Sequence, residues 1–389
     1  MQQDAPWRTA AVCGVILGLI VGIPYYGLPY FYDYFEAAFG WTRPEIMLGL
    51  PLGTIVTLIA GPLWVRRVPP RRGIVYGSLA CGAAIAGFGL QNGSLTAYYA
   101  CWAIYMAGWT FSGPLAHQIL ITHTYAVNRG KAMAGAFFGV SVFGAISVAL
   151  VARPLTDLLG FRGALLGIGA LTAMAAPIGR LALPWVDAEG PSETGPGVRL
   201  PLGRSFWLLM AGSTISVAGI GGVSQHLKLI FREAGYSSQA QLDDVFGWTL
   251  VWMLSAGAAG RFLFAWGADR YDKRRVITLA FVLMAGSMPL LFFLDRPHVP
   301  YIFGAVYGLG MSSDTLMVPL LAAGLYGRGA MARILGFVVP VNTVGQTWFP
   351  SLLSWLWTLT GNYTMPLAVT FACVLTGRAL LALLPRTSR

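Results

Sequence analysis

Charged residues are scarce in this sequence. Asp, Glu, Lys and Arg make up 11% of the 389 residues, and hydrophobic residues make up 56%. In soluble globular domains about a quarter of the residues are usually charged. A chain with this composition cannot cover its surface with hydrated side chains, which excludes a soluble globule and predicts an integral membrane protein.

Motifs of the common enzyme and metal sites are absent as well. The four cysteines lie in apolar runs without metal-ligand spacing, and the sequence contains no HExxH, no GxSxG and no Walker motif. We therefore expect no metal, no cofactor, no enzymatic activity and no direct use of ATP.

The basic excess does not indicate a nucleic-acid-binding protein. The formal net charge is +11, but Lys and Arg are scattered in short segments between long apolar runs and are not gathered on one face. We therefore expect no nucleic-acid partner and interpret these residues as signals of membrane topology.

Twelve apolar runs are candidate transmembrane helices. Each is near or above the roughly 20 residues that a helix needs to cross about 30 Å of hydrocarbon. The pattern predicts an all-α membrane protein with twelve transmembrane helices. The predicted spans lie at about 9–32, 45–65, 73–92, 97–124, 132–152, 161–184, 206–231, 242–266, 275–294, 299–324, 333–357 and 364–385.

The positions of the basic residues predict the orientation of the chain. With the N-terminus inside the cell, eighteen Lys and Arg residues fall in cytoplasmic segments and six fall outside. Because cytoplasmic loops are enriched in Lys and Arg, both termini are expected in the cytoplasm. The six residues on the outer side are Arg43, Arg153, Arg162, Lys228, Arg232 and Arg296.

The two halves of the chain repeat. Arg129 and Gly130 after the fourth span match Arg328 and Gly329 after the tenth, at an offset of 199 residues. Two six-helix pseudo-repeats related along the membrane normal produce such an offset. We predict a central cavity lined mainly by helices one, four, seven and ten. The predicted parts are an N-terminal six-helix bundle at 1–184, a cytoplasmic linker at 185–205 and a C-terminal six-helix bundle at 206–389.

One stretch of the sequence, a glycine-containing helix end that continues into a basic turn, resembles a motif of a known family. The stretch 260–275, GRFLFAWGADRYDKRR, is similar to the loop signature of the major facilitator superfamily, in which Asp269 and Arg270 match the latch positions of a gating loop. Within that superfamily, the stretches 39–43, 160–162 and 222–227 resemble the monocarboxylate-porter branch and its bacterial relatives. The resemblance covers essentially the whole chain.

This resemblance implies the major facilitator fold and a role for Arg261. In the monocarboxylate branch an arginine on the eighth helix binds the substrate carboxylate, and Arg261 is the matching position. A guanidinium offers a planar fork for a carboxylate, and placing it inside a span costs at least about 2.5 kcal/mol. The alternative is that Arg261 snorkels to the cytoplasmic interface or pairs with Asp269.

Asp314 is the only acidic residue that the sequence places deep in a span. By the repeat its counterpart in the first half is near Leu115, so the first half offers no matching charge. Asp314 is either a fixed counter-ion for Arg261 or a protonatable group that couples proton movement to transport. The two interpretations overlap, because a pair that opens on substrate binding is itself a coupling device.

The sequence departs from the branch pattern at two places. Branch members usually carry a carboxylate one turn before the arginine, and this chain has Gly257 there. They also often carry a lysine after a proline in the first helix, where this chain has Tyr30 after Pro29. Coupling in this chain would therefore need another carboxylate, and Asp314 is the candidate.

Further polar residues lie in the predicted cavity helices, and each has a structural alternative. Tyrosines of the first helix either line the cavity or form an interfacial aromatic belt. The amides and the histidine bond either the substrate or neighbouring helices. The candidate substrate contacts are Tyr26, Tyr30, His117, Gln225, Asn342 and Gln346.

These expectations describe a secondary active transporter. It would move a small, monocarboxylate-like organic anion by alternating access, coupled to protons, as a monomer in the lipid bilayer of a bacterial inner membrane. One alternative is a transporter of the same fold for a larger, less charged compound such as a drug or siderophore, in which Arg261 would be structural. The other alternative is an anion exchanger.

Overall fold

Helices make up most of the described part of the chain. The structure, a computed structural model, describes residues 6–64, 67–125, 128–186, 203–236, 238–271, 273–312, 318, 321–322, 325–326 and 328–385, and no β-strand occurs among them. The helices divide into two compact units, Met1–Ser192 and Glu193–Arg389. Most of the segment predicted as a linker, residues 187–202, lies outside the described residues.

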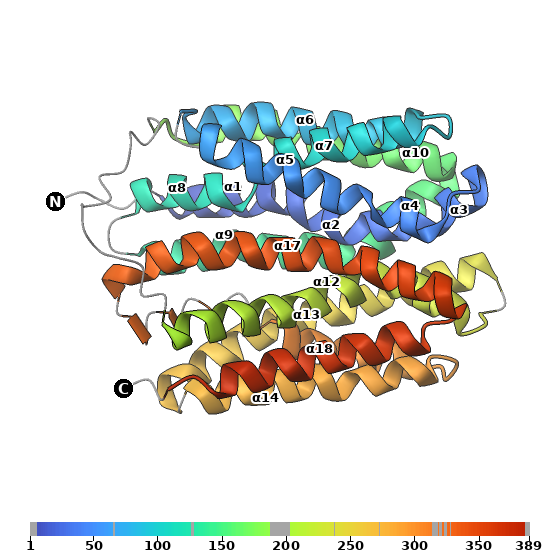
Figure 1. Cartoon of the computed structure of the whole chain (residues 1–389). Coiled ribbons are helices and arrows are strands. Elements are labelled where there is room, and N and C mark those ends of the chain that lie inside the picture. The colour runs from blue at the N-terminus through green and yellow to red at the C-terminus, as the bar shows by residue number, and fades with distance from the viewer. Residues whose placement is uncertain are drawn as a thin grey trace. The chain divides into compact units, whose positions relative to one another are not determined.

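The first unit is a bundle of long, roughly parallel or antiparallel helices (Figure 1). Within it α6 packs between α7 and α10, and α1 packs on α9. The elements are α1 (Trp7–Leu17), η1 (Gly18–Gly22), α2 (Ile23–Gly27), η2 (Leu28–Phe31), α3 (Tyr32–Phe39), α4 (Arg43–Met47), α5 (Gly49–Trp64), α6 (Pro70–Leu90), α7 (Leu95–Ser112), α8 (Pro114–Thr124), α9 (Arg129–Ile146), η3 (Ser147–Ala152), α10 (Arg153–Ala173) and α11 (Ala175–Ala182).

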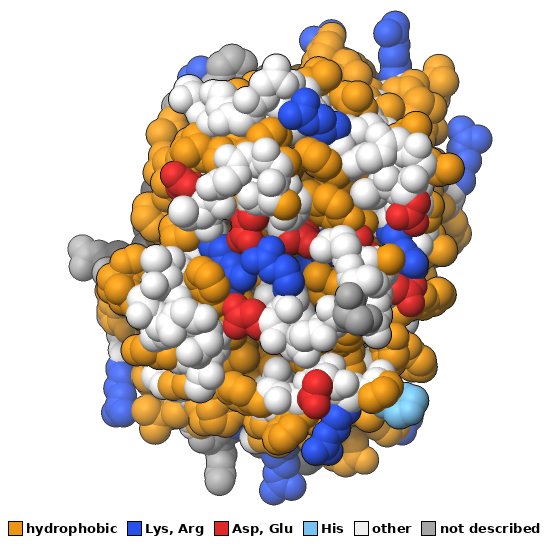
Figure 2. Space-filling model, turned by 90° about the vertical axis from the view of Figure 1, so that its right-hand side faces the viewer, with side chains coloured by type: hydrophobic (Ala, Val, Ile, Leu, Met, Phe, Trp, Pro, Cys, Tyr) orange, Lys and Arg blue, Asp and Glu red, His pale blue; other side chains and the backbone are white. Residues whose placement is uncertain are grey.

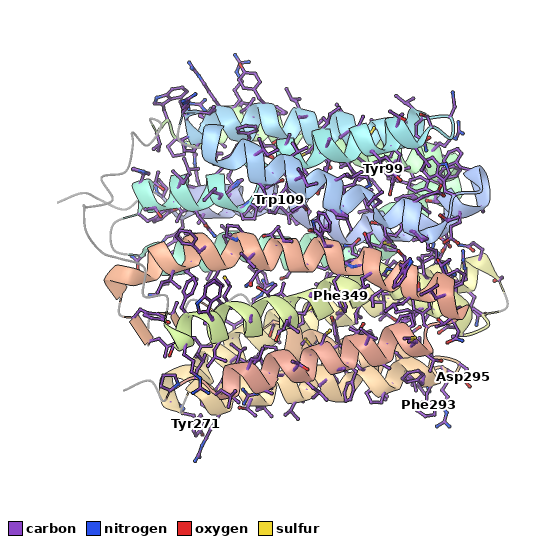
Figure 3. The ribbon with its side chains drawn as sticks, viewed as in Figure 1. Tyr99, Trp109, Tyr271, Phe293, Asp295 and Phe349 are labelled. Carbon is purple, nitrogen blue, oxygen red and sulfur yellow. The ribbon has the colours of Figure 1, made fainter. Side chains whose placement is uncertain are left out.

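The second unit is also a helical bundle. Here α12 packs on α17 and α18, and α13 packs on α15. Tyr271 and Asp295, labelled in Figure 3, lie at the two ends of the helical stretch that α14 and η4 form. The elements are α12 (Arg204–Glu233), α13 (Gln239–Arg270), α14 (Lys273–Ser287), η4 (Met288–Phe293), α15 (Val299–Met311), α17 (Arg328–Thr360) and α18 (Thr364–Ala382).

Each of the twelve predicted spans overlaps helix in the described part of the chain. Five helical stretches are by themselves long and apolar enough to cross a membrane: Trp7–Phe39, Pro70–Leu90, Gly130–Ala182, Arg204–Glu233 and Thr364–Ala382.

The stretch Gly130–Ala182 holds two of the predicted spans. Gly160 interrupts it with φ 69° and ψ 168°, a conformation that favours glycine because a Cβ would be strained there. Residue 160 therefore marks the turn between the fifth and sixth spans.

Large hydrophobic side chains cover much of the surface. Leu158 and Leu181 are 79% and 84% exposed. In Figure 2 hydrophobic side chains are exposed at many places on the surface, beside a smaller number of charged ones. Exposed apolar surface on this scale would drive aggregation in water and is suited to contact with lipid.

Candidate functional site

Arg261 lies on a helix whose backbone approaches its neighbour closely. It is half-buried, nine residues before the end of α13. A Cβ at Gly257 would lie 3.3 Å from the carbonyl oxygen of Gly308, and a Cβ at Gly304 would lie 2.8 Å from that of Thr249. A Cβ at 257 would thus need the backbone of α15 to give way by a few tenths of an ångström. This close approach favours a small residue one turn before Arg261.

Asp314 lies outside the described residues. The described part of α15 ends at Met311, and Ser312 follows as its C-cap. Gly260 directly precedes Arg261 in the sequence, and a Cβ on Gly260 would clash with the Ser312 hydroxyl. Helix α15 therefore brings the chain to the neighbourhood of Arg261 two residues before Asp314.

The two predicted latch residues occupy the end of α13. The guanidinium of Arg270 is exposed and lies 4.4 Å from the centre of the Trp266 ring, one turn back on the same helix. Such a cation–π contact at an exposed site is worth about 0.5–1 kcal/mol. The side chain of Asp269 lies outside the described residues.

Asn342 joins two helices of the second unit. Its Oδ1 accepts hydrogen bonds from Ser213 Oγ at 3.0 Å and from Thr214 Oγ1 at 2.8 Å. Both donors are on α12, whereas Asn342 is on α17. The Asn342 carbonyl oxygen is therefore engaged between helices, which is one of the two interpretations that the sequence allowed.

Gln346 and Gln225 lie on the same pair of helices. Pro350 lacks the N–H that would bond the carbonyl oxygen of Gln346, and the backbone at Gly221 packs directly against this carbonyl group. Gln225 is 3% exposed on α12, and the Gln346 side chain is half-buried. One turn before Gln225, a Cβ at Gly222 would lie 2.7 Å from the ring of Phe349, which Figure 3 labels.

Tyr26 and Tyr30 differ in their surroundings. Tyr26 is half-buried, and its ring meets that of Tyr25 edge-on at 5.1 Å. Tyr30 is completely buried, and its hydroxyl lies 3.2 Å from that of Tyr34. The 3₁₀ turn η2 begins between them, so the regular α-helical spacing that would align the two residues is interrupted.

His117 is completely buried on α8, just after a break in the fourth span. Its Nδ1 lies 3.0 Å from the carbonyl oxygen of Gly113. Its Nε2 has no hydrogen-bond partner among the described residues.

A buried ion pair in the second unit was missed by the sequence analysis. Lys228 Nζ lies 2.7 Å from Asp243 Oδ1, and the side chains are 1% and 4% exposed. Gln239 Nε2 donates a further bond to the same oxygen at 3.1 Å. The pair joins α12 to α13, and removing one partner would leave an uncompensated buried charge.

Two residues that the sequence analysis counted as outer-side topology signals are buried in ion pairs. Lys228, counted as an outer-side topology signal, lies inside α12. Arg43, counted in the same way, is 4% exposed, and its Nε lies 3.1 Å from Glu36 Oε1 in the first unit. Asp33 and Asp243, two acids that the sequence analysis did not single out, are each about 4% exposed.

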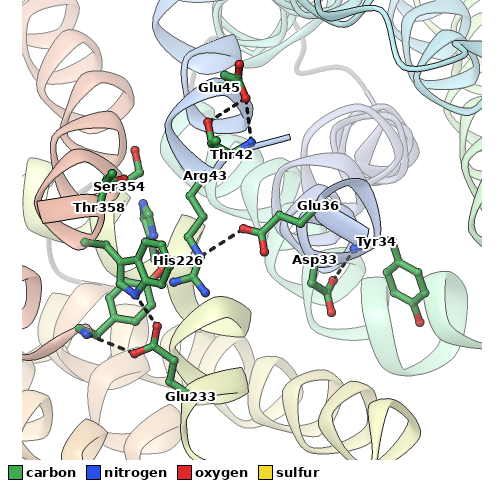
Figure 4. Close-up of polar contacts among 12 residues, drawn as sticks. Asp33, Tyr34, Glu36, Thr42, Arg43, Glu45, His226, Glu233, Ser354 and Thr358 are labelled. Carbon is green, nitrogen blue, oxygen red and sulfur yellow. Dashed lines mark hydrogen bonds and ion pairs between the residues drawn. The ribbon is translucent and has the colours of Figure 1, made fainter. Parts of the chain in front are cut away.

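A second buried polar group on α12 is His226. Its Nε2 lies 2.8 Å from the Pro350 carbonyl oxygen, and its Nδ1 lies 2.7 Å from the Tyr363 hydroxyl. Glu233 accepts bonds from the Trp357 indole and from the backbone N–H of Tyr363 (Figure 4). Together with the ion pair, these contacts tie the last third of α12 to the helices around it.

No group of three or more His, Cys, Asp or Glu side chains that could hold a metal ion occurs in the described ranges. The four cysteines are free thiols.

Comparison with known proteins points to a transporter family. The family model described as Major Facilitator Superfamily matches residues 10–350. Monocarboxylate transporter 13 of Bos taurus is 26% identical over 372 residues, which cover 91% of this chain and 84% of the relative. Monocarboxylate transporter 11 of Homo sapiens is 28% identical over 249 residues, covering 60% of this chain. The match spans only about half, 51%, of that second relative's length.

Solved structures show the same fold at low sequence identity. A bacterial homolog of the human lysosomal transporter Spinster, in an inward-facing and occupied conformation, aligns with a TM-score of 0.74 over 99% of this chain and 98% of its own. The unoccupied inward-facing form aligns with a TM-score of 0.69, over 98% and 96% respectively. Identity is 12% in both cases, so the likeness concerns the fold.

Proposed function

The chain belongs to the major facilitator superfamily and is a membrane transporter, and we propose that its cargo is a small organic anion of the monocarboxylate kind. The family match confirms the predicted all-α fold class and the prediction of a transporter in place of an enzyme. We further propose that the anion moves by alternating access and together with protons.

The proposal of an anionic cargo rests mainly on the position of Arg261. It is a permanent cation, half-buried on a helix that packs backbone to backbone against α15. A guanidinium in such surroundings favours an anionic, planar, bidentate partner, and a carboxylate has this geometry. Two relatives that are themselves named monocarboxylate transporters support the same cargo class.

Asp314 is the proposed proton-coupling residue. The contact of Ser312 with Gly260 supports this role, because it brings α15 close to Arg261 shortly before residue 314. When a substrate carboxylate occupies Arg261, Asp314 loses the neutralisation that the arginine supplies. Binding a proton then removes the uncompensated charge.

The other proposed contacts are polar groups in the predicted cavity helices. Asn342 can serve the cargo through its amide nitrogen, since its oxygen bonds α12. Asp269 and Arg270 are proposed to form the gating loop. The other proposed substrate contacts are Tyr26, Tyr30, His117, Gln225 and Gln346.

We also propose an orientation of the protein in the membrane and a cellular location. The distribution of basic residues supports both termini on the cytoplasmic side, and the two units act as the N-terminal and C-terminal halves of one monomeric transporter. The proposed location is a bacterial inner membrane.

A thermal-shift screen of the purified full-length protein tests the cargo class. Ligand that binds only the folded state raises stability by about 2.7 kcal/mol at roughly 100 times Kd. We expect short monocarboxylates to raise the melting temperature by a few degrees. Matched amides that lack the negative charge, such as propionamide beside propionate, should give no shift. Equal shifts from acid and amide would contradict an anionic cargo.

A further inference from the structure

Three arginines of the first unit meet where α6 begins and α11 ends. Arg71 and Arg72 lie in the first turn of α6, and Arg180 lies in the last turn of α11. The Arg71 guanidinium donates a hydrogen bond to the backbone carbonyl oxygen of Arg180, one of the last carbonyls of α11, which lack a partner within their own helix. This bond holds the end of α11 against the start of α6. It brings the exposed side chains of Arg72 and Arg180 to one place on the surface.

Trp185 follows α11 and contacts the same arginines. The guanidinium carbon of Arg72 lies 5.0 Å from the centre of the Trp185 ring, and Trp185 is 49% exposed. The contact holds the cation beside an aromatic ring of the kind that membrane proteins place at the level of the lipid headgroups. We call Arg71, Arg72, Arg180 and Trp185 the basic corner.

The described surroundings of the basic corner carry no negative charge. None of the described residues 67–90 and 161–186, which include α6 and α11, is acidic. The acids described in the first unit lie on α3, on α4 and near the start of α10. These elements surround the other end of α6, where the Trp41 indole donates to the Gly93 carbonyl oxygen. The basic corner therefore favours an anionic partner. The four acids are Asp33, Glu36, Glu45 and Asp157.

One face of α6 leads from this charge onto apolar surface. Its exposed side chains follow one another at helical spacing, and among them Tyr76 is 69% exposed. A rise of 1.5 Å per residue spreads them over about 16 Å, close to the roughly 15 Å of hydrocarbon in one leaflet. Along this face a cation is followed by an amphipathic ring and then by aliphatic side chains. The exposed residues that share the face are Arg72, Tyr76, Leu79 and Ala83.

We propose that the basic corner binds one anionic phospholipid, with its phosphate held by Arg72 and Arg180 and an acyl chain along the exposed face of α6. The order of chemistry along this face matches that of the lipid, in which the phosphate is followed by glycerol and then by the acyl chains. Arg71 is a positioning residue, because its bond holds α11 in place. A guanidinium donates charge-assisted hydrogen bonds to phosphate oxygens.

The charge of the headgroup determines the preference of this site. Phosphatidylcholine carries the same phosphate but also a quaternary ammonium group, which the arginines repel. Phosphatidylglycerol has no such cation and is the expected ligand class. Lipid binding here is independent of the proposed cargo. The proposed orientation places the site in the cytoplasmic leaflet.

Fluorescence of Trp185 measures occupancy of the site. The purified full-length protein is reconstituted into phosphatidylcholine liposomes that contain increasing fractions of phosphatidylglycerol. One of the two lipids carries bromine atoms, which quench indole fluorescence, on its acyl chain close to the glycerol. The signal is the difference between each protein and its Trp185→Phe counterpart. We expect the apparent affinity for phosphatidylglycerol to exceed that for phosphatidylcholine by about 10- to 30-fold, since each arginine near the surface contributes about fivefold.

Two variants test the arginines. Arg72→Gln and Arg180→Gln each remove one charge from an exposed side chain and should each lower the preference for phosphatidylglycerol about fivefold. Arg180→Gln leaves the contact of Arg72 with Trp185 in place, so it distinguishes lost lipid binding from a displaced indole. The matched control is Arg204→Gln, which removes an exposed arginine at the start of α12 and should leave the preference unchanged.

Three results would overturn the proposal. The first is equal quenching of Trp185 by the two brominated lipids. The second is an equal loss of preference in all three glutamine variants, which would show only a general attraction of a basic protein to an anionic membrane. The third is reversal of quenching by excess inorganic phosphate beyond the effect of sodium chloride at the same ionic strength, because the occupant would then be a soluble anion.

Discussion

Replacing Arg261 with lysine is expected to weaken transport of the anion by about 10- to 100-fold. Lysine keeps the positive charge but loses the planar fork that holds both carboxylate oxygens. A hydrogen bond to a charged group contributes about 1.5–3 kcal/mol, and about 1.4 kcal/mol corresponds to a tenfold change in affinity. The measurement is uptake of labelled monocarboxylate at matched protein levels, with Kd determined on the purified variant.

Arg378 supplies the matched control for this variant. It is a second half-buried arginine in a transmembrane helix, and it bonds the Thr278 hydroxyl between α18 and α14. Arg378→Lys keeps a donor for Thr278 and should leave substrate affinity unchanged. Wild-type affinity in Arg261→Lys would show that Arg261 is structural and would favour the larger, less charged cargo.

Asparagine at position 314 is expected to abolish accumulation driven by a pH gradient. The amide has nearly the same shape as the acid but cannot take up and release a proton. Binding and counterflow, in which loaded carrier exchanges labelled for unlabelled substrate, should persist, because they need no net proton movement. Accumulation and counterflow are measured in the same proteoliposomes. Because an unfolded variant would lose both activities, intact counterflow distinguishes loss of coupling from loss of folding.

Asp295→Asn makes the same chemical change at an exposed turn and should behave as wild type. Accumulation by Asp314→Asn against the substrate gradient, with only a pH gradient imposed, would remove Asp314 from the coupling role. Exchange or another titratable group would then be the better account.

Local features of the sequence were sufficient for the main elements of the fold. The third span was predicted at 73–92 and lies in α6 (Pro70–Leu90), and the twelfth was predicted at 364–385 and lies in α18 (Thr364–Ala382). An apolar run of bilayer length can satisfy its backbone only as a helix. Glycines such as Gly160 mark turns by local conformation.

Contacts between distant residues could not be predicted in the same way. Asn342 bonds Ser213 and Thr214, more than 120 residues away, and the sequence left open whether it faced substrate or a helix. Lys228 lies near the end of the seventh predicted span, and Asp243 lies near the start of the eighth, after the connecting segment. Their pairing depends on how α12 and α13 rotate about their axes, which the apolar pattern does not specify.

The interruptions of the helices were also hidden from the apolar pattern. The break at Gly113, which orients His117, lies inside one continuous apolar run at 97–124. The glycine-proline pair at 113–114 was the available signal, since the residue before a proline avoids the helical region. The close approach of the α15 backbone to Gly257, by contrast, is visible only in the packed structure.

The most direct test of the central claim is proton-driven accumulation by the purified wild-type protein in liposomes, without ATP. With the outside acidic, the concentration of labelled monocarboxylate inside the liposomes should rise above its external concentration. The pH of the lumen should also fall further than in protein-free liposomes. The protein-free liposomes measure the passive diffusion of the protonated acid. Dissipating the pH gradient should stop accumulation. Uptake no greater than in protein-free liposomes, or uptake unaffected by the pH gradient, would contradict proton-coupled transport of a small organic anion.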